Sequence, residues 1–256
     1  MIEKLLFRLV SYLIYNWKSR GNHYLHSPFI FNWYQLIVNE KLLNNDSIQK
    51  YRDDLLMDKS DFYYETIESK RIDTSISKRY KQTSIDDKYG EILSHTAHYV
   101  GAKNFLELGT SLGVSTLYLA LSSEKIQGTT IDYNPNSTNF SKNKFDSLQL
   151  HKIKFINGRF EDVLPAYLTS CEPIDLIFID GNHSYQATID NTHLIIPKLS
   201  SESVIILDDI RWSREMYKAW EELIQLDIFN YTVDFGRIGF LFKTENKSPK
   251  QHFILK

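Results

Sequence analysis

Two kinds of hydrophobic pattern divide the sequence near residue 85. On the N-terminal side, apolar residues recur at helical spacing over three stretches, at residues 5–14, 29–38 and about 47–56. Residues 59–84 are polar and charged without a clear period, so we interpret them as a connection. The pattern predicts a helical N-terminal extension over residues 1–84 and a separate domain over residues 85–256.

The second part of the chain alternates short apolar runs with stretches that are able to form helices. The predicted strands are residues 104–108, 128–132, 152–156, 175–180 and 203–208. Parallel neighbours need crossover connections, so this alternation predicts an α/β domain with a mostly parallel sheet covered on both faces. Residues 230–235 and 238–243 lie on either side of Gly236, which predicts a hairpin at the sheet edge.

Charge and cysteine usage narrow the classes of partner and compartment. The 30 basic and 32 acidic residues give a net charge of -2, which provides no overall field to attract nucleic acid. A single cysteine, Cys171, excludes an intramolecular disulfide and fits a reducing cytoplasm. The apolar opening stretch is interrupted by Arg8, lacks a small-residue cleavage site and is too short to span a bilayer. We expect a cytoplasmic protein without stable membrane insertion and without a nucleic-acid partner.

A glycine-containing turn follows the first predicted strand. In the segment FLELGTSLGVST, Gly109 and Gly113 lie where the strand gives way to a helix. Ligands collect at the carboxyl ends of strands in open α/β sheets, and glycine lets a ligand approach the backbone closely. Tight packing of a strand against a helix would also explain these two glycines.

Asp132 ends the next predicted strand, 25 residues after Glu107. A carboxylate there can accept hydrogen bonds from both ribose hydroxyls of a nucleoside, although Asp132 could instead form a turn. The turn lacks the middle glycine of a dinucleotide site, and Glu107 would repel a pyrophosphate. An acidic group suits the ammonium of a cationic amino acid, so S-adenosylmethionine is favoured over NAD.

Five motifs in family order are similar to those of class I S-adenosylmethionine-dependent methyltransferases, of the catechol and caffeoyl-CoA type and the macrolide-sugar type. The motifs are ELGTSLG at 107–113, TIDYNP at 130–135, GRFEDVLP at 158–165, FIDGNHSY at 178–185 and LDDIRW at 207–212. The resemblance implies a Rossmann-like fold whose mostly parallel seven-stranded sheet has an antiparallel last strand. It also implies that S-adenosylmethionine contacts Glu107, Gly109, Thr110, Ser111, Gly113, Ser115, Asp132, Tyr133, Gly158, Arg159, Phe160 and Asp180. Phe160 would lie beside the adenine, or would be a plain core aromatic.

Carboxylates end two further predicted strands, Asp180 on one and Asp208 with Asp209 on the other. Converging like charges repel unless a cation or a proton lies between them, and three carboxylates suit Mg²⁺ or another hard divalent ion. The resemblance implies a metal at these three aspartates. Helix caps and turns are the alternative explanation for them.

The resemblance is imperfect after Asp180. Asn182 stands where the macrolide-sugar relatives tend to have an aspartate, so it cannot be a base. His183 occupies the place of a lysine in the catechol-type enzymes, and a histidine can take up a hydroxyl proton near neutral pH. We therefore assign catalytic roles to His183 and Asp180. A turn residue bonded to backbone is the alternative for His183.

The leading hypothesis is O-methylation of a small hydroxylated molecule with help from a divalent metal. The alternatives are a metal-independent methyltransferase acting on another nucleophile, an NAD-binding oxidoreductase and a non-catalytic binding module. The resemblance implies that the extension over residues 1–84 forms a cap over the substrate pocket. Its aromatic stretch 23–34 could line that pocket, pack on the sheet or pack on the second subunit of a homodimer. Basic residues of the first helix allow a transient contact with an anionic membrane.

Overall fold

The chain forms two compact units in a computed structural model. The first unit comprises Met1–Val38 and Tyr167–Lys256, and the second comprises Asn39–Ala166. The structure describes residues 2–21, 24–39, 46–66, 70–246 and 248–256. His23, in the predicted aromatic stretch, lies outside the described residues. Each unit has its own strands and helices.

The second unit contains three parallel strands that match the first three predicted runs. β3 (Asn104–Leu108) pairs with β4 (Gln127–Asp132), which pairs with β5 (Ile153–Asn157). The connecting helices are α5 (Asp87–Tyr99), α6 (Val114–Ala120), α7 (Pro135–Ser147) and the start of α8 (Phe160–Ser170). Asn134 begins α7 by accepting the N–H groups of Asn136 and Ser137, with Pro135 at the first helical position. The sequence thus switches from strand to helix immediately after Asp132.

A hairpin and a helix replace the connection expected over residues 59–84. After α3 (Asp46–Met57), β1 (Asp61–Glu65) pairs antiparallel with β2 (Arg71–Ser75), and α4 (Ile76–Thr83) follows. The interpretation as a plain connection was wrong. β1 has three consecutive aromatic residues between two acids, and β2 has one apolar residue among polar ones, so neither sequence shows a regular alternation of apolar and polar positions.

The first unit contains five strands in the order β10-β8-β9-β7-β6. Their bounds are Ile174–Ile179 for β6, Leu199–Leu207 for β7, Tyr231–Phe235 for β8, Ile238–Lys243 for β9 and Gln251–Ile254 for β10. β9 runs antiparallel to both β7 and β8, which confirms the predicted hairpin and antiparallel strand. Together with β3, β4 and β5 of the second unit, these make eight described strands, one more than the predicted seven. The additional strand is β10, which pairs parallel with β8.

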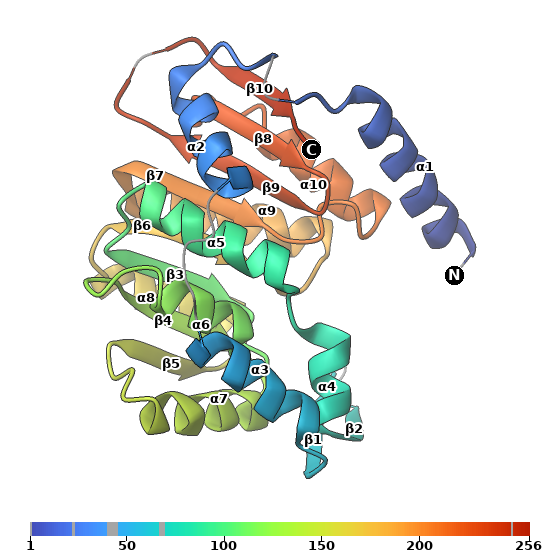
Figure 1. The fold of residues 1–256 in the computed structure, drawn as a ribbon, viewed down its shortest axis with the longest axis vertical. Helices are drawn as coiled ribbons and strands as arrows, with labels where there is room; N and C mark the ends of the chain where they lie inside the picture. The colour runs from blue at the N-terminus through green and yellow to red at the C-terminus, as the bar shows by residue number, and fades with distance from the viewer. Residues whose placement is uncertain (1, 22–23, 40–45, 67–69, 247) are drawn as a thin grey trace. The chain divides into compact units, whose positions relative to one another are not determined.

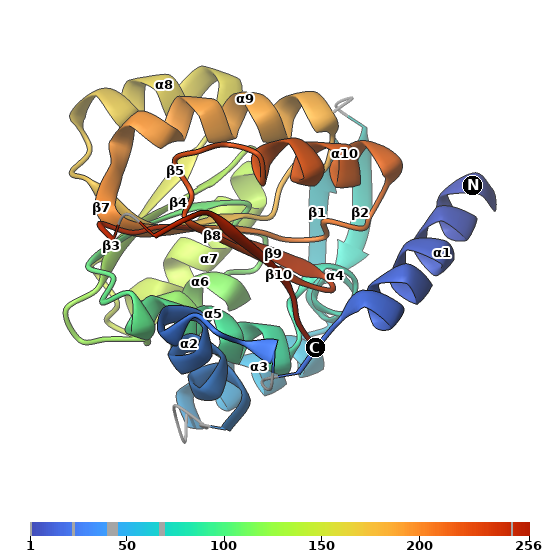
Figure 2. The ribbon, with the colours of Figure 1, turned by 90° about the horizontal axis from the view of Figure 1, so that it is seen from above.

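Helices cover both faces of these five strands. Figure 2 shows α9 (Tyr185–Ile195) and α10 (Arg214–Leu223) on one face and α2 (Pro28–Asn39) on the other. The fully buried Trp33 of α2 lies with its ring centroid 4.8 Å from that of Phe240 and 5.4 Å from that of Phe242. Aromatic packing of this kind fixes α2 on the sheet.

The end of the chain holds both N-terminal helices of the first unit. The Tyr15 hydroxyl of α1 (Ile2–Lys18) donates to the carbonyl of Leu255 at 2.5 Å, and the Tyr34 hydroxyl of α2 donates to that of Lys256 at 2.5 Å. The N–H of Arg20 donates to the carbonyl of Ile254 at 2.9 Å. In Figure 1, α1 extends away from the strands of its unit. Of the helices in the described residues, none is both long and apolar enough to cross a membrane.

Candidate functional site

Glu107 lies at the centre of a buried hydrogen-bond cluster in the second unit. Its side chain has no exposed surface. The hydroxyls of Ser115 and Thr130 each donate to it at 2.6 Å, and the Thr116 hydroxyl also donates to it. These bonds join the end of β3 to α6 and to β4. Glu107 therefore fixes the geometry of the turn that follows it.

The turn after β3 is held by the carboxylate that ends β4. Asp132 accepts the N–H of Ser111 at 2.8 Å and the N–H of Asn134 at 2.8 Å, one on each oxygen. Ser111 has a positive φ of 46°, and Gly109 has a φ of 113°, which an L side chain rarely adopts. A strained, well-bonded turn beside a carboxylate is typical of a ligand site.

Burial shifts the titration of both acids in this cluster. Burial raises the pKa of Glu107 to about 7, although the three donated hydroxyl bonds oppose the shift. Burial also raises the pKa of Asp132, against the lowering effect of the backbone N–H groups of Asn134 and Ser111. A cationic or hydroxyl-rich ligand would stabilise the ionised form of either acid.

Sequence reasoning missed three residues that support the turn. The Tyr51 hydroxyl of α3 donates to the carbonyl of Leu112 at 2.7 Å, and the hydroxyls of Thr83 and Ser111 are 2.8 Å apart. Arg79 of α4 lowers the pKa of Asp132 through its charge. All three come from elements before residue 85, and nothing local in their sequence marks them.

The remaining cofactor candidates of this unit follow β4 and β5. Gly158 donates its N–H to the carbonyl of Asp132 at 3.0 Å, and a Cβ added to Gly158 would meet Val163 at 2.3 Å. Phe160 begins α8 and is nearly buried, while the Arg159 side chain is exposed and 3.7 Å from the carboxylate of Glu161. The Tyr133 hydroxyl donates to the carbonyl of Glu65. The structure thus gathers Gly158 and Tyr133 around Asp132.

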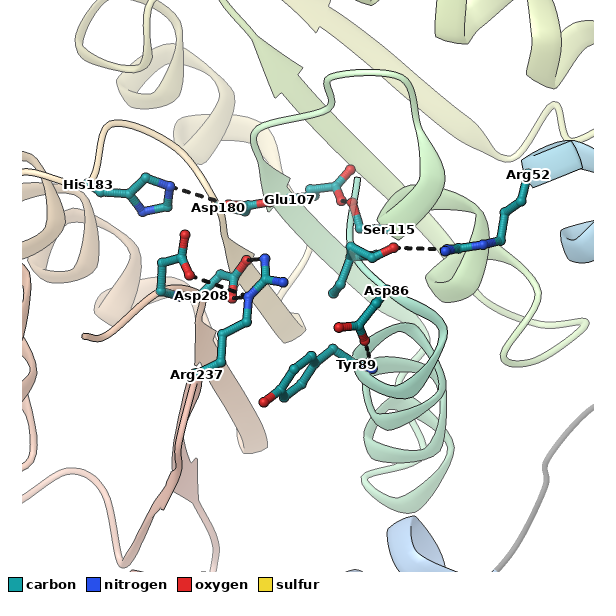
Figure 3. Close-up of polar contacts among 11 residues, drawn as sticks. Arg52, Asp86, Tyr89, Glu107, Ser115, Asp180, His183, Asp208 and Arg237 are labelled. Carbon is teal, nitrogen blue, oxygen red and sulfur yellow. Dashed lines mark hydrogen bonds and ion pairs between the residues drawn. The ribbon is translucent and has the colours of Figure 1, made fainter. Parts of the chain in front are cut away.

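In the first unit, Asp180 and His183 lie together after β6. The Nε2 atom of His183 is 3.5 Å from a carboxylate oxygen of Asp180, as the dashed line in Figure 3 shows. Both side chains are about a quarter exposed or less, so they remain accessible to a ligand. Asn182 between them has a positive φ of 47°. The turn therefore brings the two predicted catalytic residues together.

Asp208 and Asp209 end β7, and an arginine lies against both. Arg237 donates from Nε and Nη2 to the two oxygens of Asp208, at 2.8 and 2.5 Å, and its Nε is 3.4 Å from Asp209 (Figure 3). Asp208 is fully buried. Burial by itself would lower the pKa of Arg237, but the carboxylate of Asp208 outweighs burial and raises the pKa of Arg237 above its ordinary value. Burial and the neighbouring Asp208 raise the pKa of Asp209.

A second buried ion pair holds the turn that carries Arg237. Arg211 donates to both oxygens of Asp234, at 2.7 and 2.5 Å, and to the carbonyl of Gly236 at 2.7 Å. Gly236 in turn donates its N–H to Asp234 at 3.1 Å. These bonds fix the β8–β9 turn, so Arg237 is presented to Asp208 from a rigid support.

The three aspartates do not fit a divalent metal as they are placed. Both oxygens of Asp208 are bonded to Arg237, whereas a hard ion needs carboxylate oxygens free to coordinate it. Within the described part of the chain, no group of three His, Cys, Asp or Glu residues could hold a metal ion. Sequence reasoning did not find Arg237, which lies 29 residues after Asp208 and belongs to no motif.

Comparisons with known proteins find similarity to methyltransferases. Residues 106–210 match the family model for a methyltransferase domain. Catechol O-methyltransferase of Niastella koreensis is 31% identical over 102 residues, 39% of this chain and 46% of that protein. The match to a methyltransferase domain covers residues 106–210 of the 256-residue chain. The matched segment runs from β3 to the loop after β7, so it contains both groups of candidate residues.

Solved structures of O-methyltransferases share the fold of this chain. An O-methyltransferase from Bacillus cereus in complex with SAH covers 63% of this chain and 84% of its own, with a TM-score of 0.56 and 19% identity. TomG from Streptomyces achromogenes, an O-methyltransferase of tomaymycin synthesis in complex with SAM, covers 80% and 92%, with a TM-score of 0.60 and 13% identity. At such identities the likeness establishes the fold. The chain spans about half the length of the curated relatives it matches.

Proposed function

We propose that the protein transfers a methyl group from S-adenosylmethionine to a hydroxyl oxygen of a small molecule. The observation that carries the proposal is the buried cluster of Glu107, Ser111 and Asp132 at the ends of β3 and β4. The methyltransferase match over residues 106–210 and the O-methyltransferase names of the relatives support the same reaction.

The second unit holds the cofactor in this proposal. Asp132 keeps lone pairs on both oxygens after accepting two N–H groups, so it can accept the ribose hydroxyls. The turn from Gly109 to Gly113, with Thr110, Ser111 and Ser115, faces the methionine part, and Glu107 keeps that turn in place. Tyr133, Gly158, Arg159 and Phe160 surround the adenosine. These residues fit the cofactor because the turn is already bonded in the strained form that a ligand needs.

The first unit holds the acceptor. S-adenosylmethionine supplies a methyl group that its sulfonium already makes electrophilic. The residues of this unit then have to align a hydroxyl oxygen, and such alignment can contribute about 7–11 kcal/mol. His183 takes the hydroxyl proton and Asp180 orients the imidazole, which adds a smaller factor of about 10²–10⁴ in rate. Divalent-metal assistance is not included, because Arg237 already binds Asp208.

Calorimetry on the folded protein tests the proposal directly. We expect saturable binding of S-adenosylmethionine and of S-adenosylhomocysteine, and no binding of NAD. Binding of NAD alone would support the oxidoreductase instead. Tight cofactor binding without methyl transfer to any of a broad panel of hydroxylated molecules would support a non-catalytic binding module.

The compartment and partners are part of the proposal. A single half-buried cysteine fits a reducing cytoplasm. The net charge of -2 provides no overall field to attract nucleic acid, so the acceptor in this proposal is a small molecule. A homodimer remains a prediction, which molecular-mass measurement in solution checks.

A further inference from the structure

Arg237 occupies the place at which the catechol-type resemblance puts a metal ion. The fork of its guanidinium matches the two oxygens of Asp208 in a bidentate pair, the strongest geometry for such an interaction. Asp209 also lies within 3.4 Å of the same Nε atom. One side chain thus approaches two of the three aspartates that were expected to bind a metal.

The ion pair of Arg237 and Asp208 is largely enclosed by the protein. Asp208 is fully buried, and the guanidinium is about three-quarters buried. Removing a cation from a buried carboxylate is strongly unfavourable, so a divalent ion would have to displace Arg237 from Asp208. The backbone adds a further constraint, because Ile210 donates its N–H to the carbonyl of Arg237 at 3.0 Å. Side-chain and backbone hydrogen bonds therefore both join the loop of the aspartates to the turn of the arginine.

The geometry points to Arg237 as the internal cation of the acceptor site, which makes methyl transfer by this protein independent of divalent metal. The guanidinium neutralises Asp208 and Asp209, the function that a bound ion would otherwise serve, and it holds the loop after β7 in place. Arg237 is a positioning residue in this account, and the account rests on the proposed methyl transfer.

Titration with Mn²⁺ tests the inference without any substrate. We expect no saturable Mn²⁺ binding by the wild-type protein in calorimetry and electron paramagnetic resonance. The Arg237→Ala variant should gain saturable Mn²⁺ binding, because the buried carboxylate of Asp208 no longer has the guanidinium as its partner. Arg237→Lys keeps the charge and should not gain it. Arg214→Ala removes an exposed arginine of the same unit and is the matched control.

Two results would overturn the inference. The first is saturable Mn²⁺ binding by the wild-type protein that Asp209→Asn removes. The second is methyl transfer that stops with EDTA and returns with Mg²⁺. If Arg237→Ala does not fold, the wild-type protein and Arg237→Lys still decide the question. Cofactor calorimetry on the same samples tests the proposed function separately, so the two failures can be told apart.

An independent observation concerns the outer face of α1. Most of its exposed side chains are large and apolar, namely Leu5, Leu6, Leu9, Val10, Tyr12, Leu13, Ile14 and Trp17, and the other exposed residues are Glu3, Lys4, Asn16 and Lys18. Ser11, Tyr15 and Ser19 are buried and mark the opposite side of the helix. On that inner side, the Arg8 guanidinium lies 3.5 Å from the ring centroid of Trp212, and its Nε donates to the Trp212 carbonyl at 3.0 Å. The helix is thus attached through the side that carries Arg8 and Tyr15, and its exposed apolar residues lie on the other side.

We infer that α1 lies on an anionic lipid surface with this apolar face. Residues 1–20 carry four basic side chains and one acidic side chain, whereas the whole chain has a net charge of -2. A helix with Trp and Leu on one face and Lys or Arg on the other is typical of interfacial membrane helices. Trp17, which is 76% exposed, would lie at the headgroup level.

The charges disfavour a second copy of the chain as the occupant. In an antiparallel pair of α1 helices, Lys4 of one copy approaches Lys18 of the other. Parallel pairing brings identical basic residues together. Glu3 is the acidic residue of α1 and offsets one of these charges, whereas anionic headgroups attract both lysines.

Vesicle sedimentation tests this inference. We expect the full chain to sediment with phosphatidylcholine vesicles that contain phosphatidylglycerol, and much less with phosphatidylcholine alone. Leu9→Glu should weaken binding at least tenfold, and Lys18→Gln about fivefold. Ser201→Glu adds the same charge at an exposed position of β7 and should leave binding unchanged. Absence of sedimentation with anionic vesicles would overturn the inference, as would a dimer in solution that Leu9→Glu dissociates.

Discussion

The carboxylate of Asp132 accepts the backbone N–H of Ser111 at 2.8 Å, so the residue that ends β4 also holds the turn after β3. A ligand bound by Asp132 is therefore bound to a turn that is already formed. Preorganisation of this kind reduces the ordering cost of binding.

Replacing Asp132 tests the cofactor site. Asp132→Ala should weaken S-adenosylhomocysteine binding by about 100-fold, because hydrogen bonds to a charged acceptor are lost. Isothermal calorimetry measures the change. Asp132→Asn keeps the size of the side chain and separates lost charge from lost packing. Asp162→Ala removes an exposed acid on α8 and should bind normally; an equal loss there would contradict the assignment.

Glu107 should make stability depend on pH. Its pKa is raised from 4.5 to about 7, so between these values the folded state holds a proton that the unfolded state has released. The free energy of unfolding should therefore fall as the pH rises through this window, by roughly 3 kcal/mol, and Glu107 should contribute no further slope above it. Urea unfolding of wild-type and Glu107→Gln proteins across this window isolates the contribution. Identical pH slopes for the two proteins would refute the prediction.

The Arg211–Asp234 pair should contribute strongly to stability. Both side chains are almost completely buried, at 3% and 2% exposure. Asp234→Ala leaves a buried guanidinium without its partner and should lower the free energy of unfolding by about 3–5 kcal/mol. Asp73→Ala removes an ion pair that is more than half exposed and should cost less than about 1 kcal/mol. Denaturant unfolding compares the two variants.

His183 and Asp180 should differ in their effect on turnover. His183→Ala should lower kcat by no more than about 10²–10⁴, since it removes only the proton acceptor. Asp180→Ala should cost more, because Asp180 is assigned both to the imidazole and to the cofactor. Steady-state kinetics with S-adenosylmethionine measure both losses, and His193→Ala, on the exposed side of α9, is the control. Equal and complete losses would contradict the division of roles.

The glycine turn and the strand-end acids could be predicted because their signals are local. Gly109, Asp132 and Asp180 each follow a short apolar run, and a parallel sheet collects such positions at one edge. Arg237 could not be found this way, because its meaning depends on a tertiary contact with Asp208, 29 residues away. The same applies to Tyr51, whose hydroxyl reaches the turn from another helix. The β1–β2 hairpin and β10 escaped because they are short, half-exposed strands with little alternation.

The attachment of α1 and α2 to the last residues of the chain has a consequence for synthesis. The carbonyls that accept from the hydroxyls of Tyr15 and Tyr34 belong to Leu255 and Lys256, which follow them by 240 and 222 residues. On a ribosome, which produces the N-terminal side first, neither helix can complete these contacts before residues 255 and 256 have emerged. The apolar surface of α1 therefore stays available to chaperones or to a bilayer throughout translation.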